Sequence, residues 1–168
     1  YSADCDLLAI RTPYVFEEVG GHDDDWDDFL RERFDFEKIV GMICEVKTGD
    51  YDKNRLFRKD LLEYCIGRLG IVPQSYVGEL SNQLEGRQLV NLNSHHQVGK
   101  LLVANEGMET KKYFYTDLES VISFLERRVE KYPTEKYGDR MFFGSILFQS
   151  VIDRTALKRK DNDRRKRA

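Results

Sequence analysis

An acid and a base stand two residues apart in the stretch ICEVKTG, residues 43–49. Glu45 and Lys47 close an apolar run that predicts a buried strand over 36–47. Because residues i and i+2 of a strand point to the same face, we expect both charges on one face of a sheet, roughly 6.6 Å apart along the strand. Burying a charge is unfavourable unless the charge is paired or bound to a metal, so these side chains need partners.

A second acid enters near the start of the chain. The stretch DCDLLAIR, residues 4–11, predicts a short strand in which Asp4 and Asp6 share one face. If this strand pairs with the strand over 36–47, Asp6 lies beside Glu45, and two carboxylates and an ammonium converge. Neighbouring carboxylates repel each other, and a divalent cation that prefers oxygen ligands relieves this repulsion. Mg²⁺ or Mn²⁺ suits such a site.

Strands and helices in a mixed order must position these residues. After the first two strands, a helix is predicted over 54–69 because five apolar residues form one stripe before Gly70, namely Leu61, Leu62, Cys65, Ile66 and Leu69. The stretch 71–97 has a weaker pattern that favours a strand over 88–93. The remaining predicted elements are a short helix around 26–34, a strand at 98–105, a helix that begins with a capping box from Thr116 to Glu119, and a last helix at 139–157. This order predicts an α/β domain with a mixed central sheet flanked by helices.

The two charged stretches together resemble the signature of the PD-(D/E)XK nuclease superfamily, which includes type II restriction enzymes, Mrr-type endonucleases and archaeal Holliday junction resolvases. DCDLLAIR and ICEVKTG carry this resemblance, and the helix over 54–69 follows them. The later stretch VGKLLVAN and the helix after it also look like the second half of such domains. The resemblance therefore runs from residue 4 to about residue 130, and it implies a restriction-endonuclease-like fold in which residues 17–35 are an insertion between the two motif strands.

The resemblance also implies roles for individual residues. Asp6 and Glu45 match the two acidic metal ligands, and the backbone carbonyl of Val46 often completes the metal shell in such sites. Lys47 matches the lysine that orients or activates the attacking water. The implied activity is a Mg²⁺- or Mn²⁺-dependent endonuclease that hydrolyses phosphodiester bonds, in DNA more than in RNA. Three cations at the start of the next helix would then stand close enough to contact phosphates, namely Arg55, Arg58 and Lys59.

Several residues have competing interpretations. Asp28 is an alternative ligand if the chain folds back, whereas Asp35 is too far along the strand, roughly 33 Å from Glu45. Asp4 is a candidate second-metal or supporting residue. Two histidine-containing stretches are better explained without a metal: the run His22-Asp23-Asp24-Asp25 as a solvated loop, and the pair His95 and His96 as a turn with exposed imidazoles.

Charge is unevenly distributed along the 168 residues. The last fifteen residues hold eight Lys or Arg and two Asp, a net of +6, which leaves −9 on residues 1–153 of a chain whose formal charge is −3. We therefore expect one domain over 1–153 and a basic C-terminal tail over 154–168 that favours nucleic acid as a partner. A non-catalytic nucleic-acid-binding or assembly module on the same fold is the alternative, with the helices at 117–132 and 139–157 forming a homodimer or partner-subunit surface.

Cysteine usage and hydropathy indicate the compartment. The three cysteines, Cys5, Cys44 and Cys65, lie in apolar stretches without paired spacing, which favours reduced thiols, no structural zinc and a cytoplasmic, intracellular protein. No apolar run approaches the roughly 18 residues of a membrane span, and no signal peptide is visible. We therefore expect no membrane partner.

Overall fold

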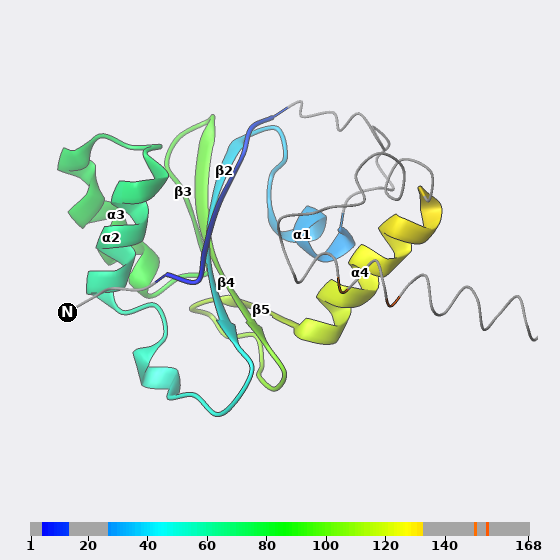
Figure 1. Ribbon diagram of the computed structural model, residues 1–168. Coiled ribbons are helices and arrows are strands. Elements are labelled where there is room, and N and C mark those ends of the chain that lie inside the picture. Colours follow the sequence, from blue (N-terminus) through cyan, green and yellow to red (C-terminus); the bar gives the residue numbers. More distant parts are fainter. Residues whose placement is uncertain (1–4, 14–26, 133–149, 151–153, 155–168) are drawn as a thin grey trace, which may run out of the picture. The chain divides into compact units, whose positions relative to one another are not determined.

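The computed structural model describes residues 5–13, 27–132, 150 and 154 (Figure 1). By its internal contacts the chain divides into two compact units. One comprises Tyr1–Phe16 with Trp26–Leu118, and the other comprises Glu17–Asp25 with Glu119–Ala168. The domain boundary at residue 153 and the basic tail over 154–168 stay predictions.

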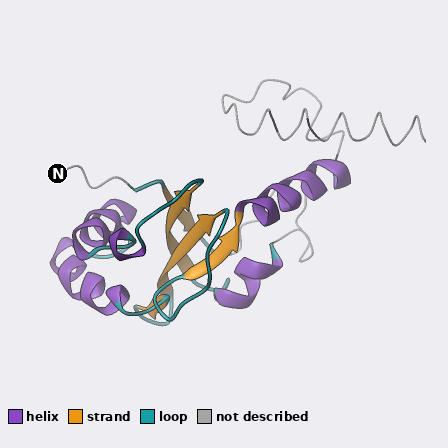
Figure 2. Cartoon of the chain, turned by 90° about the horizontal axis from the view of Figure 1, so that it is seen from below, coloured by secondary structure: helices purple, strands orange, loops and turns teal. Residues whose placement is uncertain are grey.

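A five-stranded mixed sheet forms the centre of the first unit (Figure 2). Its strands are β1 (Leu7–Arg11), β2 (Ile39–Lys47), β3 (Leu89–Asn91), β4 (His96–Ala104) and β5 (Phe114–Asp117). β2 pairs antiparallel with β1 on one edge and parallel with β4 on the other. The second edge of β4 pairs antiparallel with β3 at its beginning and parallel with β5 at its end. The predicted class, an α/β fold with a mixed central sheet flanked by helices, is thus confirmed.

Helices lie on both faces of this sheet. α2 (Lys59–Leu69) and α3 (Val77–Glu85) cover one face, and the short α1 (Asp28–Arg33) lies on the other (Figure 1). Short 3₁₀ turns at Lys53–Arg55 and Gln74–Tyr76 precede α2 and α3. α4 (Leu118–Lys131) lies almost entirely in the second unit. Among the described residues, no helix has both the length and the apolar character needed to cross a membrane.

The core between the sheet and α2 follows from the apolar stripe in the sequence. The buried residues of α2 are the five expected ones, Leu61, Leu62, Cys65, Ile66 and Leu69. They pack with residues of the central strands such as Ile43 and Leu102, both fully buried. Gly70 ends α2 with a left-handed φ of 64°, a conformation that glycine adopts without a Cβ clash. Burial of this stripe fixes α2 against the face of β2 that also carries Glu45 and Lys47.

Some elements of the structure differ from those predicted. The helix expected from residue 54 begins at Lys59, because a 3₁₀ turn and a left-handed Phe57 (φ 51°) precede it. The capping box at Thr116 is wrong, since Thr116 pairs with Val103 in β5 and the helix starts only at Leu118. Hydrogen bonding to β4 therefore overrides the local capping signal. The structure also contains α3 and β5, which the sequence pattern did not predict.

Some predictions fall on residues outside the described ranges. These include Asp4, the run from His22 to Asp25, most of the insertion over 17–35, and the last helix at 139–157 apart from Ser150 and Arg154. In the second unit, Arg154 contacts two acids of α4, Glu119 at 3.4 Å and Glu126 at 3.0 Å. The basic tail is otherwise not described, so its role in binding polyanions stays a prediction.

The close passage of β4 over Phe34 predicts a strong effect of adding one methyl group. A Cβ on Gly99 would lie 2.5 and 2.7 Å from two carbons of the Phe34 ring, which is buried and packs edge-on against Phe114. We expect Gly99→Ala to lower the free energy of unfolding by roughly 1–3 kcal/mol, measured by urea denaturation. The matched control is Gly78→Ala in α3, where the added Cβ meets open space. It should raise stability by up to about 1 kcal/mol, and similar losses in both variants would contradict the packing argument.

Candidate active site

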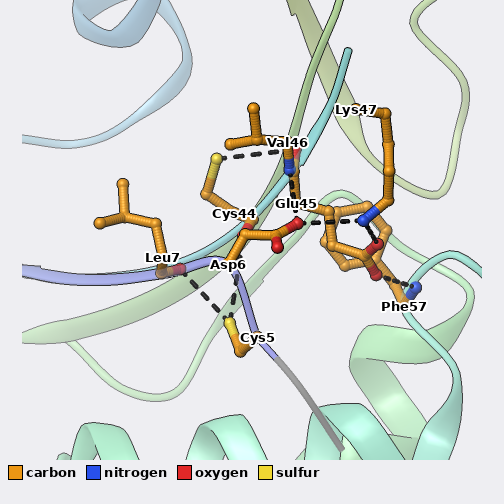
Figure 3. Close-up of polar contacts among 8 residues, drawn as sticks. All are labelled: Cys5, Asp6, Leu7, Cys44, Glu45, Val46, Lys47 and Phe57. Carbon is orange, nitrogen blue, oxygen red and sulfur yellow. Dashed lines mark hydrogen bonds and ion pairs between the residues drawn. The ribbon is translucent and has the colours of Figure 1, made fainter. Parts of the chain in front are cut away.

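Antiparallel pairing of β1 with β2 brings Asp6 to Glu45 and Lys47. Leu7 pairs with Cys44 at the end of the ladder, so Asp6 lies just beyond the last pair and next to the charged end of β2. Lys47 Nζ is 3.0 Å from Asp6 Oδ2 and 3.0 Å from Glu45 Oε2 (Figure 3). The convergence of two carboxylates and one ammonium, expected from the sequence, is confirmed as geometry.

Asp6 is held by the backbone as well as by Lys47. Its Oδ2 accepts a hydrogen bond of 2.8 Å from the Val46 N–H. Along an antiparallel edge, the N–H and C=O of one strand residue project to the same side. The Val46 carbonyl, expected as a metal ligand, therefore faces the edge of β2 that Asp6 occupies.

Glu45 is the buried member of the group and has both oxygens engaged. Only 5% of the residue is exposed. Oε2 contacts Lys47, and Oε1 accepts a hydrogen bond of 2.8 Å from the backbone N–H of Phe57 (Figure 3). A buried carboxylate with a hydrogen-bond partner on each oxygen has a fixed orientation, which a metal ligand requires.

The mutual contacts stabilise the charged forms of Asp6 and Lys47. Partial burial acts to raise the pKa of Asp6, but the Val46 N–H and the Lys47 ammonium outweigh it and hold that pKa below its usual value. Burial acts to lower the pKa of Lys47, but hydrogen bonds and charge from Glu45 and Asp6 raise it above its usual value. Lys47 is therefore a permanent cation at neutral pH in the metal-free protein, not a base.

The residues around this ammonium fit a hard divalent cation. Two carboxylates and a backbone carbonyl are the oxygen donors that Mg²⁺ and Mn²⁺ prefer, and Lys47 marks a position where positive charge is already stabilised. Mg–O distances are about 2.0–2.1 Å, shorter than the contacts to Nζ, so an ion there requires the ammonium to move aside. In the described part of the chain, no group of three or more His, Cys, Asp or Glu side chains is placed to hold a metal.

The three cations predicted to contact phosphates lie next to this site. Arg55, Arg58 and Lys59 are exposed and flank Phe57, whose N–H binds Glu45. Arg58 pairs with Asp60 at 2.9 Å, and Lys59 is 3.9 Å from Glu63 on the next turn of α2. The structure thus places these cations in the segment around Phe57, and their contact with phosphate stays a prediction.

The alternative acids and the histidines lie elsewhere. Asp28 begins α1, on the opposite face of the sheet (Figure 1). Asp35 accepts a hydrogen bond from the Glu37 N–H and pairs with Lys38 at 3.2 Å. His95 and His96 lie in and after the turn that precedes β4, where both backbone N–H groups donate to Asn93. His95 is exposed as expected, whereas His96 is half-buried.

The cysteines beside the two acids are free thiols. Cys5, Cys44 and Cys65 form no disulfide. Burial, more than the neighbouring charges, raises the pKa of Cys44 to about 12, and burial also raises the pKa of Cys65. Neither thiol is therefore ionised near neutral pH, as expected for cysteines that act as apolar core residues.

Sequence reasoning missed one residue of the site, Phe57. Its contribution is a backbone N–H, which every residue except proline carries, so the residue type gave no signal. Its position just before the first turn of α2 was also hidden, because the helix was expected to begin at residue 54.

The contacts of Asp6 predict an acid-sensitive contribution to stability. Since its folded-state pKa lies below the usual value of 3.8, the Asp6 carboxylate stabilises the fold above that pH, and this stabilisation is lost as the pH falls through the folded-state pKa. We expect the free energy of unfolding of the wild type to fall more steeply than that of Asp6→Asn between about pH 5 and pH 2. Urea denaturation at several pH values measures both slopes. Parallel curves would show that Asp6 has the same pKa in the folded and unfolded chain.

Comparison with known proteins identifies no relative of this chain. Searches against protein-family models, curated proteins and solved structures gave no match. Any function must therefore be argued from the geometry around Asp6, Glu45 and Lys47.

Proposed function

We propose that this chain is a metal-dependent endonuclease that hydrolyses phosphodiester bonds, with DNA favoured over RNA, on a restriction-endonuclease-like fold. One observation carries the proposal: Lys47 lies 3.0 Å from each of two carboxylates, one on β2 and one on the residue that precedes β1. A simple surface ion pair needs only one acid and contributes about 0–1 kcal/mol. Two acids, one of them buried, are better explained by a cation-binding site with an adjacent ammonium.

In this proposal Asp6, Glu45 and the Val46 carbonyl hold Mg²⁺ or Mn²⁺. When bound, the ion would lower the pKa of a coordinated water and offset negative charge that develops on the phosphate. Lys47, displaced from the two carboxylates, donates its hydrogen bonds to the phosphate or to the attacking water. The proposal assigns Lys47 a role through positive charge and not as a proton acceptor.

The topology around the site supports the proposed nuclease function. The strand after Asp6 pairs antiparallel with the strand that carries Glu45 and Lys47, and α2 follows on the face that these two side chains share. The chain then returns through β4, which runs parallel to β2. This arrangement matches the expectation from the resemblance, in which an aspartate strand, an E-x-K strand and a helix come in this order.

A groove beside Lys47 offers room for a nucleotide. It has a volume of about 730 Å³ and lies between the segments that follow β2 and β4, with Thr48 and Tyr51 on one wall and Asn105 and Met108 on the other. The Asn105 N–H donates to the Lys47 carbonyl at 3.3 Å, so the groove adjoins the charged end of β2. Crevices at the carboxyl ends of parallel strands commonly hold ligands in α/β folds.

The nuclease proposal predicts metal-dependent nicking that depends on Lys47. We expect plasmid nicking with Mg²⁺ or Mn²⁺, lost with EDTA, and reduced by about 10²-fold or more in Lys47→Ala, Asp6→Asn and Glu45→Gln. The matched control is Lys38→Ala, a lysine that flanks the other end of β2 and pairs with Asp35. Activity that persists in Lys47→Ala would end the proposal. DNA binding without cleavage in the wild type and in every variant would favour the non-catalytic module.

The cations beside the site predict a measurable contribution to DNA binding. Arg55 is exposed near Glu45, whereas Arg68 is exposed at the far end of α2. With EDTA present to prevent cleavage, Arg55→Ala should reduce the slope of log affinity against log salt concentration by about 1, measured by fluorescence anisotropy on duplex DNA. Arg68→Ala should leave this slope unchanged. Equal slopes for both variants would place the bound phosphates elsewhere.

A further inference from the structure

Phe57 adopts an unusual backbone conformation at the point where it binds Glu45. It is the one non-glycine residue with positive φ in the described part of the chain, at 51°. This region is unfavourable for residues with a side chain, so surrounding contacts must hold the residue there. In this conformation the Phe57 N–H reaches Glu45 Oε1 at 2.8 Å.

Two side chains from other parts of the first unit hold the Phe57 ring. The Lys100 ammonium lies 5.4 Å from the ring centroid, within the range of a cation–π contact. The Tyr113 ring packs against Phe57 with a centroid distance of 5.5 Å. All three side chains are buried, so the ring has little freedom to leave this position.

Burying the ammonium group of Lys100 in this core is energetically unfavourable. It lies in the middle of β4, is fully buried, and donates one hydrogen bond of 3.1 Å to the Glu85 carbonyl at the end of α3. Burial, together with the positive charge of Lys112, lowers the pKa of Lys100 to about 8, and the Glu85 carboxylate opposes this shift. A methionine of similar shape would avoid the cost of burying an ammonium, so the charge needs an explanation beyond packing.

We propose that Lys100 is a positioning residue for the Glu45 carboxylate and acts through the ring and the backbone N–H of Phe57. The ammonium holds the ring, the ring keeps the backbone left-handed, and the N–H then orients Glu45 on the side opposite Lys47. The consequence for metal binding rests on the proposed function. The consequence for the Phe57 N–H follows from the contacts of the metal-free protein alone.

Nuclear magnetic resonance of the metal-free protein tests the link directly. In wild type, the Phe57 amide proton should be shifted downfield and protected from exchange by its bond to a buried carboxylate. Lys100→Met keeps the side-chain volume and removes the charge, so we expect an upfield shift and faster exchange of this amide with no loss of global stability. A purely structural role at the end of α3 predicts no change at Phe57, and an unchanged Phe57 amide overturns the proposal.

A second variant covers the case in which Lys100→Met does not fold. Phe57→Leu keeps the N–H and most of the apolar volume but removes the aromatic face on which Lys100 acts. It should show the same upfield shift and faster exchange of the amide at residue 57. An amide that keeps its wild-type shift and protection in Phe57→Leu equally overturns the proposal.

Lys112→Met is a control that keeps the Lys100 ammonium but shifts its pKa upward. Lys112 is exposed, and removing its charge should raise the pKa of Lys100 without removing the ammonium. The Phe57 resonances should therefore match wild type at neutral pH. As the pH rises through the Lys100 titration, they should change at a higher midpoint in Lys112→Met than in wild type. The charged groups that act on Lys100 are Glu85 and Lys112, and Tyr113 is the titratable group whose ring packs against Phe57. A midpoint in Lys112→Met equal to or below that of wild type overturns the assignment to Lys100.

Metal affinity separates this inference from the proposed function. If Asp6 and Glu45 bind Mn²⁺, Lys100→Met should weaken Mn²⁺ binding by about 10–100-fold, measured by electron paramagnetic resonance. Wild-type protein that binds no Mn²⁺ would end the nuclease proposal, whereas the Phe57 amide would still decide the positioning role. Mn²⁺ affinity that is unchanged in a folded Lys100→Met protein would overturn the inference while leaving the nuclease proposal intact.

Discussion

Compensation of charge at the end of β2 is the constraint on which the site depends. Burying the Glu45 charge is unfavourable unless the carboxylate has partners. Lys47 contacts only one oxygen of the Glu45 carboxylate, so Lys47 alone would leave the other oxygen without a partner. The Phe57 N–H supplies the second partner, and Asp6 shares the ammonium from the neighbouring strand. Three separate segments, β1, β2 and the turn before α2, must therefore be in place before this group of charges is stable.

The pattern of side chains in the sequence predicted much of this arrangement. The apolar stripe of α2 and the apolar runs of β2 and β4 are strong periodic signals, and the structure contains all three elements, although α2 begins at Lys59 and not at residue 54. The spacing of Glu45 and Lys47 placed both on one face, because strand geometry leaves no alternative. The approach of Asp6 could be inferred only by assuming that two strands pair, although 38 residues lie between Asp6 and Glu45.

What the sequence did not show depends on backbone groups and on distant contacts. The N–H groups of Val46 and Phe57 complete the site, yet neither residue type indicates this role. Thr116 carries a local helix-capping signal that loses to a strand pairing with β4, because hydrogen bonds from a distant segment outweigh a local preference. Lys100 lies within the predicted strand at 98–105, and only the fold shows that it is fully buried with its ammonium near the Phe57 ring.

The two lysines near Glu45 stand in different physical situations, and this difference has a consequence for the proposed chemistry. Lys47 is partly exposed and lies between two acids, which raise its pKa in the metal-free protein, so its ammonium could move toward a phosphate when a metal takes its place. Lys100 is enclosed and has a lowered pKa, so the surrounding core disfavours its charge while it fixes the position of the side chain. When Lys47 leaves Glu45, the Phe57 N–H still donates its hydrogen bond to that carboxylate, and Lys100 supports the ring of Phe57. The two lysines would thus have different roles. Lys47 would move toward the phosphate, whereas Lys100 would stay in the core and keep the Glu45 carboxylate aligned.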